Sequence, residues 1–370
     1  MGTIAEGLEG VVVTSTKLSD VDGEAGRLII GGYDVEALTG RVSFEATCHL
    51  LWRGSLPSQA EEHALRRALG EARAAAFATL SSRRELLAMN DAMDALRALV
   101  AGIALPSGRW PDEAVALTGA TAVFVAAYAR HRSGAALVEP DATRGHAEDY
   151  LRMAGVDPHP ARVAGLDAYL STVTDHGMNA STFAARVVAS TGSDIVSSIT
   201  AAIGALKGPL HGGAPGPVLD MLDAIGEPGQ ATAWLETELA TGRRIMGMGH
   251  RVYRVRDPRA AVLERALGVL EADLGADRGG SARLALARAV EAAATKTLAR
   301  KYPNRSLQAN VEFYTAVLLD AVGLPRWLFS ATFAVGRVAG WCAHVEEQRS
   351  RGRLIRPASV YDGPRFTSAS

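Results

Sequence analysis

Three histidines stand at breaks between predicted helices, where a side chain can project into a cleft. They are His176 in DHGMNAS, His211 in PLHGGAPGP and His250 in GMGHRVYR. A glycine beside a histidine removes side-chain bulk, so a ligand can approach the backbone. We therefore treat the three as a candidate acid–base set. The other six histidines show no partner pattern and are expected to be structural: His49, His63, His131, His146, His159 and His344.

Arginines crowd the nine positions that follow His250: Arg251, Arg254, Arg256 and Arg259. The chain has 39 Lys and Arg against 40 Asp and Glu, so its overall charge does not call for a basic cluster here. Arginine offers permanently charged, planar donors that pair with carboxylates or phosphates, although a solvated helix face is the alternative. Together with Glu312 in QANVEFYTA, Arg259, Arg337 and Arg356, the histidines suggest acid–base chemistry beside an anion pocket.

Other common catalytic motifs do not fit. GMGHRV lacks the third glycine of GxGxxG, and GxxxxGK[ST], GxSxG and HExxH do not occur. Cys48 and Cys342 are far apart and have no ligand spacing, which argues against both a disulfide framework and a zinc site. We expect no metal.

Composition is that of an ordinary soluble protein rather than a nucleic-acid binder, with 48% hydrophobic residues, 21% charged residues and a net charge of −1. A length of 370 residues suggests two or more domains. The apolar stretch 114–129 is short for a membrane span and fits a buried helix, so no membrane association is expected. The first residues lack a basic region before an apolar run, and we expect a cytoplasmic location.

The elements that would position these groups are mostly helices. Short strands are predicted at GVVVTST and RLIIGGYDV, separated by the turn-rich SDVDGEAG. Ser58 with Glu61 forms a capping box, Asp257-Pro258 starts a helix, and three glycines mark helix ends: Gly226, Gly242 and Gly323. Two segments rich in Gly, Pro or Asn, 204–217 and 301–310, bracket about 100 residues, the size of a small domain.

At these residues the sequence resembles the citrate synthase family. The resemblance runs in the family's order through GLEGVVVTST, LLWRGSLPS, DHGMNAS, LKGPLHGGAPGPV, MGMGHRVYRVRDPRA, NVEFYTAVLLDAVGLP, GRVAGWCAHVEEQ and RLIRPASVYDGP. It implies an all-α, citrate synthase-like homodimer with a few short N-terminal strands. Each subunit would have a large helical domain, residues 1–209 and 309–370, and a small helical domain, residues 210–308, that closes over the site.

The resemblance also implies roles for single residues. His211 would hydrogen-bond the thioester oxygen of acetyl-CoA, Glu312 would remove a methyl proton, and His250 would donate to the oxaloacetate carbonyl. The oxaloacetate carboxylates would be held by His176, Arg259, Arg337 and, reaching in from the partner subunit, Arg356. Coenzyme A would border Met246, Gly247 and Gly249, with Arg254 near its phosphates. The CoA thioester is a substrate, and no tightly bound cofactor is expected.

One position departs from the usual family pattern, in which NVDFY carries Asp where this chain has Glu312. Because a misplacement of about 1 Å can cost around 100-fold in rate, either the backbone is set back for the longer side chain or the reaction is slow. The leading prediction is citrate synthesis from acetyl-CoA and oxaloacetate. The alternatives are 2-methylcitrate synthesis from propionyl-CoA, since one methylene changes discrimination by only about 1–3 kcal/mol, and a weakly catalytic, ligand-sensing paralogue.

Overall fold

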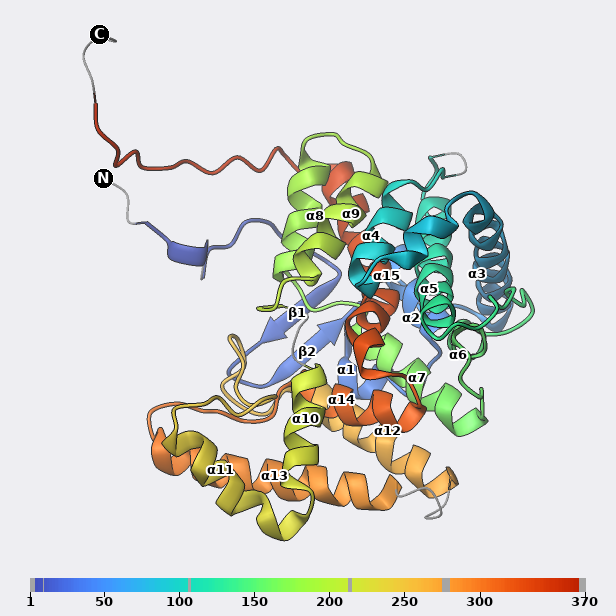
Figure 1. Cartoon of the computed structure of the whole chain (residues 1–370). Coiled ribbons are helices and arrows are strands. Elements are labelled where there is room, and N and C mark those ends of the chain that lie inside the picture. The colour runs from blue at the N-terminus through green and yellow to red at the C-terminus, as the bar shows by residue number, and fades with distance from the viewer. Residues whose placement is uncertain (1–3, 9, 106–107, 212–214, 275–279, 366–370) are drawn as a thin grey trace.

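A computed structural model describes residues 4–8, 10–105, 108–211, 215–274 and 280–365. Helices make up most of the chain (Figure 1), which confirms the all-α prediction. The sheet is a small antiparallel one near the N-terminus, with strand order β1 (Ser19–Asp22), β2 (Arg27–Ile30) and β3 (Tyr33–Asp34). Val21 pairs with Leu28, and Ile30 pairs with Tyr33.

The sequence-based prediction placed the first strand wrongly. GVVVTST, residues 10–16, forms neither strand nor helix, and SDVD, which was assigned to a turn, is β1. The pairing explains the error, because β1 and β2 form a hairpin that buries Leu28 and Ile30 against the helices. The valine run has no partner strand among the described residues, and Val12 is 88% exposed.

One group of helices contains the long, buried α5. Its members are α1 (Val35–Leu38), α2 (Phe44–Arg53), α3 (Gln59–Thr79), α4 (Ala92–Ala101), α5 (Asp112–Arg132), α6 (His146–Ala154), α7 (Pro160–Val173), α8 (Ala180–Ser190), α9 (Ile195–Leu206) and α15 (Phe329–Arg351). Among the described residues, α5 alone is long and apolar enough to cross a membrane, but most of it is buried inside the protein between α3, α4, α6 and α15. It is a core helix, as the sequence predicted.

The remaining helices lie on the lower side in Figure 1. They are α10 (Pro215–Ile225), α11 (Ala231–Ala240), α12 (Pro258–Leu274), α13 (Gly280–Lys301) and α14 (Val311–Val322). A 3-10 turn, η1 (Glu6–Leu8), precedes the sheet. Others lie between helices: η2 (Leu80–Ser82), η3 (Arg84–Ala88), η4 (Pro228–Gln230) and η6 (Arg326–Leu328). Because α12 and α14 also pack against α7, they connect this second group to the first.

Local signals placed several helix ends correctly. Ser58 and Glu61 form the predicted capping box at the start of α3, and α12 begins at Pro258. Gly226 follows α10, Gly242 lies two residues after α11, and Gly323 ends α14; all three have positive φ. Such ends depend on a few neighbouring residues, so a single sequence is enough to find them.

Helix α15 passes unusually close to the end of α7. A Cβ on Gly336 would lie 2.8 Å from the carbonyl oxygen of Leu170, and one on Gly340 would lie 1.9 Å from that of Thr174. Glycine therefore lets the two backbones touch, and the segment that follows Thr174, which carries His176, rests directly on α15. This contact positions one of the candidate site residues.

Candidate active site

A cavity of about 790 Å³ lies where α8, α14 and α15 meet the segments 209–211 and 249–252. Seven of the predicted site residues line it: His176, His211, Gly249, His250, Arg259, Glu312 and Arg337. They come from parts of the sequence up to about 160 positions apart, and the fold brings them to one place. The N-terminal segment also borders the cavity, through Gly7, Leu8, Gly10, Val11 and Val13.

His250 is held in one tautomer by the backbone. The N–H groups of Val252 and Tyr253 donate to its Nδ1 at 3.0 and 3.1 Å. The ring proton must then lie on Nε2, which makes this nitrogen a hydrogen-bond donor. Burial and the nearby Arg259 lower the pKa of His250 from 6.5 to about 4, so the ring is neutral at physiological pH. Gly249 has φ +88°, and a Cβ there would lie 2.9 Å from Leu307.

Glu312 lies in the first turn of α14. Asn310 caps this helix by accepting the N–H of Glu312 at 3.0 Å, and its side-chain amide donates to the carbonyl of Gly249 at 2.8 Å. The residue borders the cavity, but its Oε2 is buried and has no hydrogen-bond partner among the described residues. Burial raises the pKa of the carboxyl to about 7, against the lowering effect of Arg259. A group with this pKa can take up or release a proton near neutral pH.

Two buried arginines face the cavity with different partners. Arg259 is 3% exposed and donates through Nε and Nη2 to the two carboxylate oxygens of Asp257, at 3.0 and 2.7 Å. Burial opposes its charge, but Asp257 raises the pKa of Arg259. Arg337 is 1% exposed, donates to the carbonyl of Val173 and lies over the ring of Phe333 at 4.5 Å. Burial lowers its pKa to about 10, so both arginines stay cationic at neutral pH.

His211 follows α9 and points at Ser181. Its Nε2 lies 2.8 Å from Oγ of Ser181, which donates to Asn179 and accepts the indole N–H of Trp341 at 3.1 Å. Burial, Arg337 and Arg259 lower the pKa of His211 to about 4. The ring is therefore neutral. Residues 212–214 of its motif lie outside the described part of the chain.

His176 is the most deeply buried of the three histidines, at 9% exposure. Its Nε2 lies 3.1 Å from the hydroxyl of Tyr253. Burial, Arg259 and Arg337 hold its pKa well below the usual value. The neighbouring Asp175 accepts a 3.0 Å hydrogen bond from Nε2 of His344. All three histidines of the site are thus neutral beside two cations, an arrangement that suits an anionic ligand.

Four predicted site residues do not line the cavity. Arg356 is exposed on the extended segment after α15, which leaves the body together with the N-terminal segment beside α8 (Figure 1). Arg254 is exposed and donates its backbone N–H to Gly23. Met246 packs against the core. Gly247 is close to Phe313, and a Cβ at this position would lie 2.9 Å from it. Their roles in partner and CoA contacts stay predictions.

Two histidines expected to be structural are so, through partners that the sequence did not reveal, and one carboxylate has a further partner. His344 and His146 are fully buried and bonded: Nδ1 of His344 accepts the Nε–H of Arg186 at 2.9 Å, and Nδ1 of His146 lies 3.3 Å from Arg73. Asp257, which was recognised only as a helix start, also accepts the N–H of Val311 at 3.2 Å beside Glu312. These partners are distant in sequence, so no local signal identifies them.

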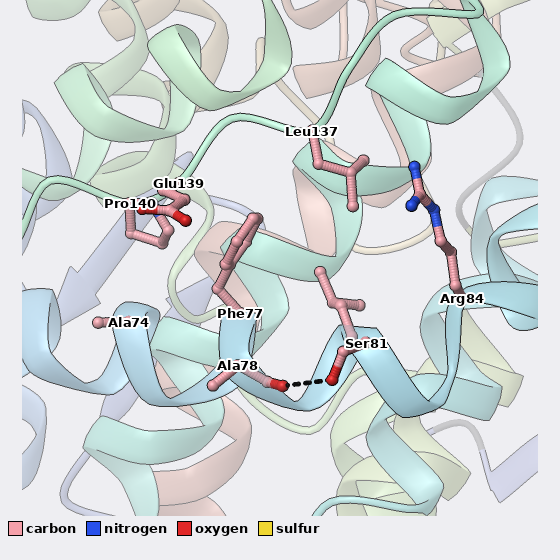
Figure 2. A pocket seen from close by; sticks show the side chains of 9 residues that line it. Ala74, Phe77, Ala78, Ser81, Arg84, Leu137, Glu139 and Pro140 are labelled. Carbon is pink, nitrogen blue, oxygen red and sulfur yellow. Dashed lines mark hydrogen bonds between the residues drawn. The ribbon is translucent and has the colours of Figure 1, made fainter.

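A second cavity, of about 600 Å³, lies between the end of α3 and residues 137–140. Figure 2 shows Phe77 and Leu137 facing it, with Arg84 and Glu139 at opposite ends. It shares no residue with the first cavity, and none of the predicted site residues lines it.

Comparison with known proteins assigns the chain to a family. A family model described as "Citrate synthase, C-terminal domain" matches residues 7–358. The chain belongs to the citrate synthase family. A citrate synthase of Haloferax volcanii is 38% identical over 98% of this chain and 96% of its own length. A 2-methylcitrate synthase of Mycobacterium tuberculosis is 36% identical, over 97% and 91%.

Solved structures of the family agree in fold. The ternary complex of carboxymethyl coenzyme A and oxaloacetate with citrate synthase from Thermoplasma acidophilum aligns with a TM-score of 0.85. It is 28% identical and covers 100% of this chain and 99% of that one. As a member of the citrate synthase family, the protein is a condensing enzyme that transfers an acyl group, with a CoA thioester and oxaloacetate as the substrates the family uses.

Proposed function

We propose that the enzyme condenses acetyl-CoA with oxaloacetate and hydrolyses the resulting thioester, giving citrate and coenzyme A. The observation that carries this proposal is the convergence of a carboxyl with a pKa of about 7, Glu312, with three neutral histidines and two buried arginines in one cavity. Supporting it, the solved structure of the Thermoplasma acidophilum relative is a complex with carboxymethyl coenzyme A and oxaloacetate. We also propose that the enzyme works in the cytoplasm.

Each side chain has a step suited to its chemistry. Ionised Glu312 removes a proton from the acetyl methyl group, while His211 hydrogen-bonds the thioester oxygen on which negative charge develops. The new carbanion attacks the carbonyl carbon of oxaloacetate, and Nε2–H of His250 donates to the carbonyl oxygen as it becomes an alkoxide. Arg259, Arg337 and His176 bind the two carboxylates. Water then cleaves the thioester and coenzyme A leaves.

The homodimer is a further part of the proposal. Both terminal segments expose apolar side chains, including Val12 at 88%, Leu354 at 58% and Tyr361 at 62%. Packing of these segments on a second copy would cover them and would carry Arg356 toward the partner's cavity. Coenzyme A would lie along the backbone from Met246 to Gly249, with its phosphates near Arg254.

The test is release of free thiol from acetyl-CoA and from propionyl-CoA, each with and without oxaloacetate. We expect release that requires oxaloacetate and is faster with acetyl-CoA. Faster release from propionyl-CoA would instead support 2-methylcitrate synthesis, the reaction after which the Mycobacterium tuberculosis relative of 36% identity is named. Release from neither thioester would contradict both and favour a ligand-sensing role.

A further inference from the structure

Tyr253 contacts two of the three cavity histidines, although neither the motifs nor the family resemblance gives it a role. Its side chain is 1% exposed. The hydroxyl lies 3.1 Å from Nε2 of His176, and the ring centroid lies 4.7 Å from that of His250 and 5.6 Å from that of His176. The two histidine rings are themselves 5.6 Å apart. The three rings form one buried cluster at the cavity wall.

We propose that Tyr253 is a positioning residue whose hydroxyl sets the tautomer of His176, while its backbone N–H and that of Val252 hold His250. Its backbone N–H donates to Nδ1 of His250, which leaves the proton of that ring on Nε2. Its hydroxyl, 3.1 Å from Nε2 of His176, would donate to that nitrogen and leave the proton of the ring on Nδ1. This inference rests on the proposed function, because it supposes that both rings must present a donor to the bound keto-diacid.

The direction of the hydroxyl hydrogen bond is assigned from the anionic ligand that the cavity is proposed to bind. The low pKa of His176 gives the ring a single proton, and burial raises the pKa of Tyr253 so that the hydroxyl keeps its own. A carboxylate held by Arg259 and Arg337 requires donors around it, and a bare ring nitrogen would repel it. Donation by the hydroxyl removes that repulsion by placing an N–H on Nδ1. A phenylalanine could fill the same space without fixing the proton.

Tyr253→Phe is the matching experiment, because it keeps the ring packing and the backbone N–H and removes only the hydroxyl. We expect KM for oxaloacetate to rise about tenfold while kcat changes less than about threefold, as for loss of one buried hydrogen bond that acts on binding. Nitrogen-15 NMR of histidine-labelled protein should show His176 losing its single-tautomer signal. His176→Ala identifies that signal by its disappearance.

Tyr150→Phe serves as the control. Tyr150 is equally buried and its hydroxyl lies 2.7 Å from that of Thr332, away from the cavity. Its loss should leave the oxaloacetate KM unchanged and so separate a general packing defect from a positioning effect. Thermal melting of both variants shows whether either is merely destabilised.

A double-mutant cycle decides whether Tyr253 acts through His176. Adding Tyr253→Phe to His176→Ala should raise KM no further. Full additivity, or an unchanged KM and His176 spectrum in Tyr253→Phe alone, overturns the inference while the proposed function stands. If His176→Ala itself leaves the oxaloacetate KM unchanged, both the inference and the assignment of His176 to the substrate site are wrong. The proposed reaction is still tested separately, by oxaloacetate-dependent thiol release.

Discussion

Glu312→Gln should inactivate the enzyme and at the same time make it more stable at alkaline pH. The glutamine removes the basic oxygen, so turnover should fall by at least about 100-fold. It also removes a carboxyl whose Oε2 is buried without a partner among the described residues and whose pKa is raised to about 7. The folded protein must expend free energy to ionise this group, and the amide never ionises.

The size of the stability effect follows from the pKa difference. Glutamate has an ordinary value of 4.5, so the folded state binds the proton more tightly between pH 4.5 and about 7. The unfolding free energy therefore falls as the pH rises through this window, by about 3 kcal/mol at about 1.4 kcal/mol per unit. Compared with the parent, Glu312→Gln should gain up to that amount at pH 8 and little at pH 4.5.

Denaturant unfolding at pH 4.5 and pH 8 measures this gain. Glu85→Gln, a change at an exposed glutamate on η3, is the control.

The parent's kcat/KM for acetyl-CoA should rise about tenfold between pH 6 and pH 8, because the fraction of ionised carboxylate rises by that factor for a pKa of about 7. Glu312→Asp should also lose about 100-fold in rate if its carboxylate falls about 1 Å short.

Methyl-proton exchange gives the decisive result. Acetyl-CoA is incubated with a non-reacting oxaloacetate analogue in heavy water. If Glu312→Gln exchanges the methyl protons as fast as the parent, Glu312 is not the base. If the variant shows no greater stability gain at pH 8 than at pH 4.5, the carboxyl is not held at a raised pKa.

Three further predictions concern other parts of the molecule. Arg356→Ala should lose most activity and, after verified subunit exchange with His250→Ala, should recover part of it in mixed dimers; no recovery would place Arg356 outside the partner's site. Burial and Glu45 raise the pKa of Asp167 to about 8, so the unfolding free energy should fall as the pH rises from about 4 to 8. Asp167→Asn should therefore stabilise the protein by at least about 1 kcal/mol in thermal melts at pH 8. Gly340→Ala should lower the unfolding free energy by about 3 kcal/mol or more, whereas Gly229→Ala, with open space around it, should change it little in the same denaturant titration.

Much of the site could be predicted because its residues lie in short motifs, and the residue types in each motif indicate the chemistry. Helix ends such as Ser58 and Gly323 were also predictable, since the determining contacts lie within a few residues. The family resemblance supplied what spacing could not, namely that His176, His250 and Glu312 meet in one cavity. The structure confirms that meeting, and their roles stay proposals.

What failed depends on contacts between distant parts of the chain. The propensity of a valine run favours a strand, but only a partner strand makes one, and β2 pairs with SDVD instead. His344 appeared unpartnered because Asp175 and Arg186 lie about 160 positions away in sequence. Likewise, the raised pKa of Glu312 depends on burial by neighbouring elements, which its own motif does not contain.

The hydrogen bond from the indole of Trp341 to Ser181 gives the protein an internal optical probe. Ser181 also bonds His211, so the fluorophore is separated from a candidate catalytic ring by one hydroxyl group. Trp52 and Trp110 donate instead to backbone carbonyls. A ligand that draws His211 away from Ser181 would change the polarity at the indole of Trp341, and the emission of this tryptophan would follow binding at the thioester side of the cavity without any added label.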